Sequence, residues 1–491
     1  MHNRFRTALA AATVAALTGG LMAATAGSAA AEGDRPTADF NGDGFRDLAV
    51  SAPFATVNGQ ARAGQVVVLY GSAAGITTSS KRTLISQDSP GVPGASETGD
   101  GFGHDTTAAD FNNDGFTDLA VGTPREKVGD DVNGGTVQII WGSASGLYGG
   151  TTVPDPSPGS HDRFGYVLDA ADYDGDDLAD LAVGTSSSYV RVFRGGFGKG
   201  KGEYGGAYGV RPAILSGADT GPMNLHSGDV NGDDIADLVV DGYERDATDG
   251  GDYHWNANYY VPGSASGLTA SGQQKLPAGL ITDIGDVNSD GFGDIVIGMD
   301  FDADSGVPGS RTGGLVNVLH GSPSGPSGAR QSFTQDSPGV PGGSERYDGF
   351  GAELDLGDVN GDGHLDLAVG TPGESLGEAK YTGAVVVLYG AADGSGLTGA
   401  GSQLIHQDSP GVPGGNETED QFGSDVHLAD MNDDGLADLT VGALGENNGN
   451  GAVTALRSDG TQIAGGGYFL SVSRVGVSSA GTPLFGVNFA G

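Results

Sequence analysis

The chain has 491 residues, no cysteine and a net charge of −40, with 92 glycines and only 7% aromatic residues. This negative charge argues against nucleic acid as a partner, because the phosphates would be repelled. The absence of cysteine excludes disulfides as the means of stabilisation, and the composition favours many short strands joined by tight turns.

Residues 1–31 have the pattern of a secretory signal peptide. Arg4 and Arg6 form a basic start, an Ala-rich apolar run continues to about Gly27, and the small residues 29–31 offer a cleavage site. The alternative is an N-terminal membrane anchor, which the cleavable small-residue motif disfavours. No other segment reaches the ~20 apolar residues of a membrane-spanning helix. We therefore expect a secreted, extracellular protein without a transmembrane segment.

An Asp-rich segment, D-x-[ND]-x-D-[GD]-x-x-D, is the most regular feature of the sequence. Its seven copies begin at Asp39, Asp110, Asp172, Asp229, Asp286, Asp358 and Asp430. Each copy leads directly into a short apolar stretch with β-branched residues, such as residues 48–50, which predicts a buried strand. The intervals between copies leave room for a four-stranded sheet with its loops, so the repeat predicts one blade for each copy.

Three further motifs recur around these Asp loops. A second strand begins at a glycine in four of the repeats, at Gly64, Gly135, Gly314 and Gly383. A strand that ends in Gln-Asp precedes the sequence S-P-G-V-P-G at Gln87, Gln335 and Gln407. A Phe-Gly pair stands at a constant distance before the Asp loop at Phe102, Phe164, Phe350 and Phe422. No segment has sustained helical periodicity, so we expect an all-β fold.

The two ends of the chain complement each other. The first Asp loop has almost no sequence before it and lacks a Phe-Gly pair, whereas the chain ends with the segment 485–491, which begins with Phe485-Gly486 and has no Asp loop. This arrangement predicts a seven-bladed β-propeller over residues 34–491, in which about residues 482–491 complete the first blade. Closure would remove the exposed sheet edges that template aggregation.

The Asp loops have the composition of calcium sites, since calcium takes six to eight oxygen ligands. Side chains at loop positions 1, 3, 5 and 9 and the backbone carbonyl at position 7 can face one centre. Position 6 requires a sharp bend, which Gly supplies in five loops and which Asp177 and Asp234 supply less readily in loops three and four. The predicted ligands are Asp39, Asn41, Asp43, Phe45, Asp47, Asp110, Asn112, Asp114, Phe116, Asp118, Asp172, Asp174, Asp176, Leu178, Asp180, Asp229, Asn231, Asp233, Ile235, Asp237, Asp286, Asn288, Asp290, Phe292, Asp294, Asp358, Asn360, Asp362, His364, Asp366, Asp430, Asn432, Asp434, Leu436 and Asp438.

Two other interpretations of these loops are less consistent with the sequence. Acidic turns without metal would place clustered carboxylates together seven times without compensation. An EF-hand would need a bidentate Glu at position 12, where this chain has apolar residues such as Val50 and Val121. Calcium is favoured over magnesium because magnesium demands stricter octahedral geometry. We expect up to seven calcium ions.

The combination of Phe-Gly, Asp loop and a partial Gly-x-Pro turn, as in Gly122-Thr123-Pro124 and Gly370-Thr371-Pro372, resembles the FG-GAP repeat of integrin α-subunit propellers and of bacterial secreted proteins. The resemblance implies structural calcium in the hairpin between the first two strands of a blade, on the face opposite the ligand face. The sequence shows neither an inserted metal-dependent adhesion domain nor leg domains, so an integrin-type partnership with a β-subunit is not implied.

The sequence gives weaker indications of the ligand. Candidate ligand-face residues are Phe54, the segment Tyr243 to Tyr260 with His254 and Trp255, Lys380-Tyr381 and the three S-P-G-V-P-G loops. No catalytic motif is evident, so we expect a monomeric binding or adhesion module for an extracellular protein or glycan rather than an enzyme. A glycan-binding, lectin-like propeller and a polysaccharide-acting enzyme on the same fold are the alternatives.

Overall fold

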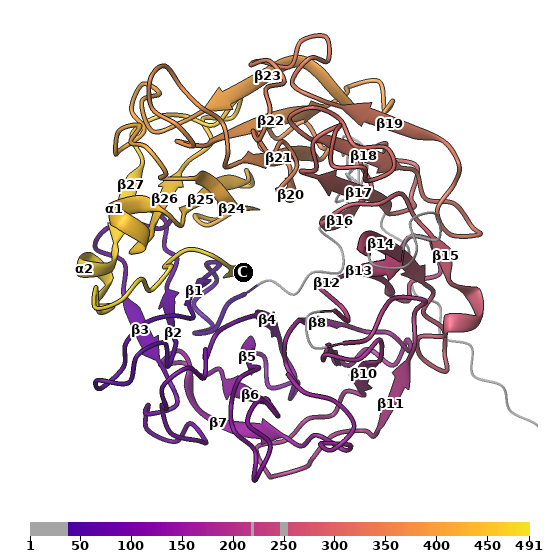
Figure 1. Ribbon diagram of the computed structural model, residues 1–491, viewed down its shortest axis with the longest axis vertical. Helices are drawn as coiled ribbons and strands as arrows, with labels where there is room; N and C mark the ends of the chain where they lie inside the picture. Colours follow the sequence, from indigo (N-terminus) through magenta and orange to yellow (C-terminus); the bar gives the residue numbers. More distant parts are fainter. Residues whose placement is uncertain (1–37, 218–219, 246–253) are drawn as a thin grey trace, which may run out of the picture.

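The computed structural model describes residues 38–217, 220–245 and 254–491, which form a ring of seven four-stranded antiparallel sheets (Figure 1). We call the sheets blades 1 to 7 in the order of their Asp loops, and count the strands of each blade outward from the ring axis. The sequence prediction of a seven-bladed all-β propeller is confirmed. The predicted signal peptide lies outside the described residues.

The first four blades are formed by strands from Leu48 to Lys275 together with the C-terminal strand. Blade 1 consists of β28 (Phe489–Ala490), β1 (Leu48–Ala52), β2 (Gln65–Leu69) and β3 (Arg82–Ile85). Blade 2 consists of β4 (Thr106–Ala109), β5 (Asp118–Thr123), β6 (Thr136–Trp141) and β7 (Tyr148–Val153). Blade 3 consists of β8 (Leu168–Ala171), β9 (Asp180–Val183), β10 (Val190–Phe193) and β11 (Ala207–Val210). Blade 4 consists of β12 (Asn224–Gly228), β13 (Asp237–Arg245), β14 (His254–Val261) and β15 (Gln274–Lys275).

The remaining three blades complete the ring. Blade 5 consists of β16 (Ile281–Gly285), β17 (Asp294–Met299), β18 (Leu315–Leu319) and β19 (Arg330–Phe333). Blade 6 consists of β20 (Glu353–Gly357), β21 (Asp366–Thr371), β22 (Ala384–Gly390) and β23 (Leu397–Ile405). Blade 7 consists of β24 (Phe422–Ala429), β25 (Asp438–Ala443), β26 (Ala452–Leu456) and β27 (Tyr468–Ser471). The short helices are η1 (Ala270–Gly272), α1 (Glu446–Gly449) and α2 (Val472–Val475). Within the described ranges, no helix is long and apolar enough to cross a membrane.

The core lies between blades rather than within them. Leu48 and Val50 of β1 pack in a cluster with blade 7, while Ala49 between them packs in a cluster with blade 2. Side chains on a strand alternate between its two faces, so a strand covered on both sides must be apolar at every position. Among the described residues, each of the seven junctions between neighbouring blades has such a cluster. This explains why the strands after the Asp loops are uninterrupted apolar runs.

The Phe-Gly pairs join each blade to the one before it. Phe102 is fully buried, and its backbone N–H donates to the carbonyl of Ala63 at 2.9 Å. The adjacent Gly64, which leads into the third strand of blade 1, must lack a side chain because a Cβ there would overlap the Phe102 carbonyl. The same pairing of a Phe with a glycine in the preceding blade recurs at Phe164 with Gly135, Phe350 with Gly314, Phe422 with Gly383 and Phe485 with Gly451. The two recurring sequence motifs are therefore the two halves of one contact.

The C-terminal segment closes the ring as the sequence predicts. Strand β28 pairs antiparallel with β1, so that Ala490 lies opposite Ala49 and Phe489 opposite Val50. Phe485, in the same segment, is fully buried against blade 7. Because the first strand of blade 1 comes from the end of the chain, the segment that follows blade 7 completes the sheet of blade 1, and blades 1 and 7 share one core cluster.

Loss of the Phe485 ring should therefore destabilise the whole propeller. We expect Phe485→Ala to lower the free energy of unfolding by about 3–5 kcal/mol, the usual cost of deleting a buried Phe ring. Denaturant titration measures this value, and Tyr148→Ala, which removes a ring that is 67% exposed, is the matched control. Equal stability of the two variants would mean that Phe485 does not contribute to closure.

Candidate metal centres

The seven Asp loops lie on one face of the ring. In blades 2 to 7 each loop is the hairpin between the first and second strands, and in blade 1 it leads into β1. In an antiparallel blade, successive connections lie at alternate ends of the strands. The connections between second and third strands, and those between blades, therefore lie on the opposite face. The fold thus places the Asp loops opposite two sets of connections, while the connections between third and fourth strands share the face of the Asp loops.

The carboxylates at positions 1 and 5 are oriented by the backbone of their own loop. In loop one, Asp39 accepts hydrogen bonds from the N–H groups of Gly42 at 2.7 Å and Gly44 at 2.9 Å. Asp43 accepts one from the N–H of Phe45 at 3.1 Å. The bond from the position 7 N–H to the position 5 carboxylate is present in all seven loops. The loops thus share one geometry with their acids preorganised.

Each loop bends through two residues with a left-handed backbone. Position 6 has positive φ in every copy, including Asp177 with φ 63° and Asp234 with φ 61°. Loops three and four therefore have the same backbone conformation as the five loops with glycine. Position 4 is also left-handed, a feature that the sequence analysis missed although Gly42, Gly175, Gly232 and Gly361 stand there. The glycines at loop positions 4 and 6 were the sequence signal for this double bend.

The aspartate at position 9 is buried and links the loop to the third strand. Asp47 is fully buried, and it accepts N–H hydrogen bonds from Gly71 at the end of β2 and from Phe40, both at 2.9 Å. Equivalent bonds at position 9 come from Gly142, Gly195, Gly263, Gly321, Gly390 and Ser458. Burial raises the pKa of this carboxyl to about 7 in six loops and to about 6 in Asp294. A buried carboxylate of this kind needs a compensating positive charge.

The side chain at position 7 connects neighbouring loops. Each position 7 residue is half-buried, and Phe116 of loop two lies over Gly42 of loop one, where a Cβ would overlap its ring. In loop six, the His364 imidazole lies 3.1 Å from the Ser289 hydroxyl of loop five. Position 7 therefore packs along the loop face from blade to blade rather than into the core.

Loop three gives the most direct indication of a cation. One carboxylate oxygen each of Asp172, Asp174 and Asp176 lies within 4.8 Å of the others. Asp174 pairs with the Arg194 guanidinium through one oxygen, while its other oxygen and one oxygen of Asp180 are buried without a hydrogen-bond partner. Buried oxygens without partners, among clustered carboxylates, fit a divalent cation whose ligands are all oxygen. In the other six loops position 3 is Asn, whose amide donates to the position 9 carboxylate in loops one, two, four and seven.

The predicted ligand-face residues differ in exposure and in the kind of element that carries them. The Phe54 ring is covered by the guanidinium groups of Arg62 and Arg125, 4.8 and 5.7 Å from its centroid. The segment Tyr243 to Tyr260 is not a long loop, because strands β13 and β14 extend into it from both ends. Tyr381 is 41% exposed in the connection between β21 and β22. The three S-P-G-V-P-G loops lie in connections between blades.

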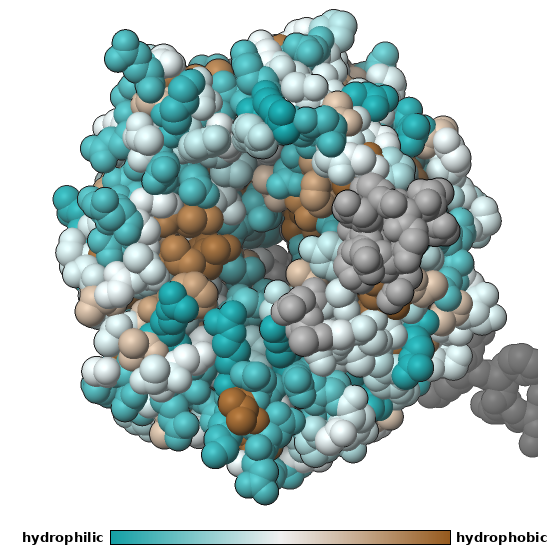
Figure 2. Space-filling view, viewed as in Figure 1, coloured by the Kyte–Doolittle hydropathy of each residue, from teal (hydrophilic) through white to brown (hydrophobic). Residues whose placement is uncertain are grey.

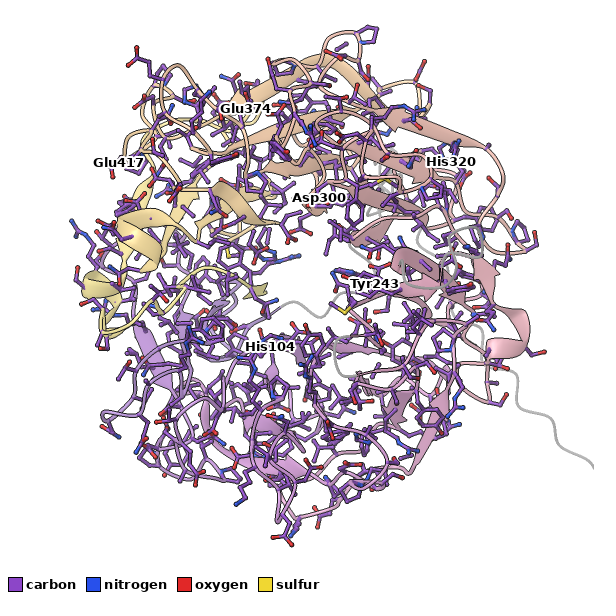
Figure 3. The ribbon with its side chains drawn as sticks, in the orientation of Figure 1. His104, Tyr243, Asp300, His320, Glu374 and Glu417 are labelled. Carbon is purple, nitrogen blue, oxygen red and sulfur yellow. The ribbon has the colours of Figure 1, made fainter. Side chains whose placement is uncertain are left out.

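Polar side chains that the sequence did not reveal as a group surround the central opening. Asp105, directly before β4, Asp355 of β20 and His427 of β24 belong to different blades and line one cavity there. Figure 3 labels the neighbouring His104, Tyr243 and Asp300 around the opening. Burial raises the pKa of Asp105 to about 7, while burial and nearby arginines lower that of His104 to about 4. The sequence signal was a polar residue three positions before the Asp loop in blades 2 to 7, with a second one five positions before it in blades 2, 4, 6 and 7. Only the closed ring brings these side chains together.

The fold and its loops define a seven-bladed propeller with one Asp loop in every blade. The FG-GAP repeat model matches residues 36–69, 102–140, 350–388 and 422–456, and the FG-GAP-like repeat model matches residues 172–240. The chain is an FG-GAP repeat β-propeller, related to integrin α chains and to phosphatidylinositol-glycan-specific phospholipase D. Its acidic clusters are of the type found at FG-GAP calcium sites.

The relatives are much longer than the matched region. Rat phosphatidylinositol-glycan-specific phospholipase D is 32% identical over 30% of this chain, which covers 17% of that protein. Integrin α-PS2 of Drosophila melanogaster is 28% identical over 55% of this chain, covering 15% of the integrin. A crystal structure of BBS1N in complex with ARL6DN, soaked with lead, is 12% identical and covers 84% of this chain and 88% of that chain, with a TM-score of 0.38.

Removal of divalent cations should destabilise the ring. Because each loop that binds calcium only in the folded state adds about 2.7 kcal/mol at a concentration 100 times its Kd, we expect excess chelator to lower the Tm by at least about 10 °C. Differential scanning calorimetry measures this, and added calcium should restore the original Tm.

A variant in one Asp loop measures how much calcium that loop binds. Asp43→Asn should remove about one calcium ion per chain in equilibrium dialysis, whereas Asp304→Asn, a change at an exposed acid outside the loops, should remove none. A melting curve unchanged in chelator, with no metal found by elemental analysis, would refute calcium in the loops.

Proposed function

We propose that this chain is a secreted, calcium-stabilised propeller that binds an extracellular macromolecule through the face opposite the Asp loops. The calcium ions are structural, up to seven in number, and the chain has no catalytic activity of its own. In this proposal the protein acts as a monomeric binding or adhesion module that has no transmembrane segment and does not bind nucleic acid.

The distribution of exposed apolar side chains supports this choice of face. Among the described residues, the large hydrophobic side chains that are exposed are Val128, Val132, Tyr148, Tyr347 and Tyr381. All except Tyr148 lie in connections on the face opposite the Asp loops. Exposed aromatic and apolar residues on one face are typical of interaction sites. Figure 2, in the same orientation as Figure 1, shows apolar areas near the central opening amid a mostly hydrophilic surface.

Blade 6 has the strongest candidate for a contact point. Tyr347, 56% exposed, precedes the first strand of blade 6, and Tyr381, 41% exposed, lies between its second and third strands. The two connections are joined by a hydrogen bond of 2.9 Å from the Gly373 N–H to the Asp348 carbonyl. Two tyrosines on connected loops present rigid rings at little cost in conformational entropy.

The names of the relatives are consistent with two kinds of role. The integrins among the relatives support a role as a binding module. Phosphatidylinositol-glycan-specific phospholipase D supports the enzyme alternative, because its name is that of an enzyme. The central cavity with Asp105, Asp355 and His427 is the observation that favours the enzyme alternative. A glycan-binding propeller remains the other alternative.

Binding should depend on the two tyrosines. We expect the Tyr347→Ala/Tyr381→Ala variant to bind immobilised extracellular proteins from the producing cells at least about tenfold more weakly, because a buried tyrosine at an interface contributes 2 kcal/mol or more. Tyr148→Ala, an exposed tyrosine on the outer strand β7, is the control that should bind normally. Equal binding by both variants would place the interface elsewhere.

The alternatives are separated by two assays on the same protein. A glycan array probed with and without calcium would support the lectin-like function if specific glycans bound, and silence on every glycan would exclude it. Turnover of polysaccharides by the purified chain, abolished by Asp355→Asn, would establish the enzyme alternative and overturn the present proposal.

Export makes a separate prediction. We expect the mature protein in the culture medium to begin at Glu32, because cleavage after Ala31 follows the small-residue motif. Mass spectrometry of the secreted chain measures its N-terminus. A protein retained in the cytoplasm with residues 1–31 intact would contradict the proposed localisation.

A further inference from the structure

A second set of acidic residues recurs three times, away from the Asp loops. Each copy has a glutamine, a first glutamate, an aspartate and a second glutamate. The glutamine and the second glutamate are 39 residues apart in every copy, and the first glutamate precedes the aspartate by 3. We call these sets the junction clusters; they are Gln87, Glu97, Asp100 and Glu126, then Gln335, Glu345, Asp348 and Glu374, then Gln407, Glu417, Asp420 and Glu446.

Each junction cluster lies between two blades on the face opposite the Asp loops. The glutamine follows the outer strand of one blade, for example Gln335 after β19. Glu345 and Asp348 lie in the connection to the next blade, and Glu374 lies between the second and third strands of that blade. The clusters therefore occupy the junctions of blades 1 and 2, 5 and 6, and 6 and 7. Figure 3 labels Glu374 and Glu417, which belong to two neighbouring clusters.

The carboxylates converge in two of the three clusters, and in every cluster the aspartate and the second glutamate are more buried than the first glutamate. One oxygen each of Glu345, Asp348 and Glu374 lies within 4.8 Å of the others, and the same holds for the cluster at Glu417, Asp420 and Glu446. Asp348 is 2% exposed and Glu374 is 6% exposed. Among the residues that the structure describes, no ion pair involves any of these acids. Three acids at one junction thus have no positive partner in the protein.

The glutamine of each cluster provides an independent indication of a ligand. Gln335 is 1% exposed, and its amide nitrogen donates to the Glu374 carboxylate at 2.6 Å, so the side chain enters the cluster. Its amide oxygen is buried without any hydrogen-bond partner, and the same is true of Gln87 and Gln407. A buried carbonyl oxygen without a partner costs about 1–3 kcal/mol. The same unsatisfied oxygen beside the same acids, three times in one chain, indicates that the site receives a cation.

The surrounding backbone keeps this arrangement in place. The last glycine of each S-P-G-V-P-G loop lies against the glutamine amide, as Gly342 does against Gln335, and no Cβ fits there without displacing the amide. Gly373, next to Glu374, donates its N–H to the Asp348 carbonyl at 2.9 Å. The repeated loop that the sequence suggested as a ligand contact therefore covers the glutamine of the cluster.

Blades 5 and 1 show what replaces the second glutamate where the full motif is absent. Asp302 of blade 5 stands at the same place after its Asp loop as Glu374 does in blade 6. It lies 3.8 Å from the Arg346 guanidinium and accepts N–H hydrogen bonds from Gly313 at 3.0 Å and Tyr347 at 3.1 Å. In blade 1 the equivalent residue is Ala55, which is uncharged. Among the described residues, the acids that stand at this position in the full motif, Glu126, Glu374 and Glu446, form no ion pair with a basic side chain.

We propose that the three junction clusters are calcium sites of a second class, in which two glutamates, an aspartate and the glutamine amide oxygen hold one ion between neighbouring blades. The donors are all oxygen, and the first glutamate of each cluster is exposed, which leaves room for the water ligands and irregular geometry that calcium accepts. The clusters contain no His or Cys, so zinc and copper are poorer fits. The ions link the outer strand of one blade to the connection of the next.

Anomalous diffraction from crystals of the full chain grown with calcium chloride tests the proposal directly. We expect anomalous peaks next to the amide oxygens of Gln87, Gln335 and Gln407. Peaks in the Asp loops together with none at these junctions would overturn the proposal. Peaks at the junctions with none in the Asp loops would support it and would instead contradict calcium in the loops, so the two claims fail separately.

Metal stoichiometry in solution provides the second test. Equilibrium dialysis with elemental analysis should find about one calcium ion fewer per chain in Glu374→Gln, which keeps the size of the side chain and removes its charge. Glu378→Gln is the matched control, an exposed acid in the same connection that should lose no calcium. Should Glu374→Gln bind as much calcium as Glu378→Gln, the proposal would be wrong. Glu446→Gln repeats the comparison at another junction if the first variant folds poorly.

Discussion

The whole fold depends on the packing of each blade against its two neighbours. A blade of this ring is one sheet thick and has no core of its own, so its strands become stable only when both faces are covered. Val50 and the adjacent Ala49 contact opposite neighbours, and every junction repeats this arrangement. Such a fold cannot end with an uncovered blade. The C-terminal strand β28 is therefore a requirement of the architecture, because it joins the first blade to the last.

The large excess of acidic residues imposes a second constraint, because their mutual repulsion has to be balanced. The chain has 63 acidic and 23 basic residues and no disulfide, so repulsion between carboxylates opposes the compact ring. The acids are concentrated in the Asp loops on one face and, by our inference, in the junction clusters on the other. In both places buried oxygens converge without enough basic side chains to balance them. Divalent cations in the Asp loops would therefore link strands within a blade, and cations in the junction clusters would link neighbouring blades.

The same separation of faces bears on function. The Asp loops share one geometry and use their face for metal, which leaves the opposite face free to differ from blade to blade. The exposed tyrosines of blade 6 and the polar cavity at the axis both lie away from the loops. The relatives of this chain include both integrin α chains and a phospholipase D, so the fold alone does not assign an activity. The activity depends on the side chains of the face opposite the Asp loops.

The sequence by itself determined the blade number, the Asp loops and the closure at Phe485, because each is a local motif repeated with constant spacing. It also showed the recurring Phe and Gly residues, but not that Phe102 packs on Gly64, since that contact joins different blades. Only the tertiary structure revealed the ring of polar residues at the axis and the convergence of Gln335 with Glu374. These groups are far apart in the chain, and the packing of neighbouring blades is what brings them together.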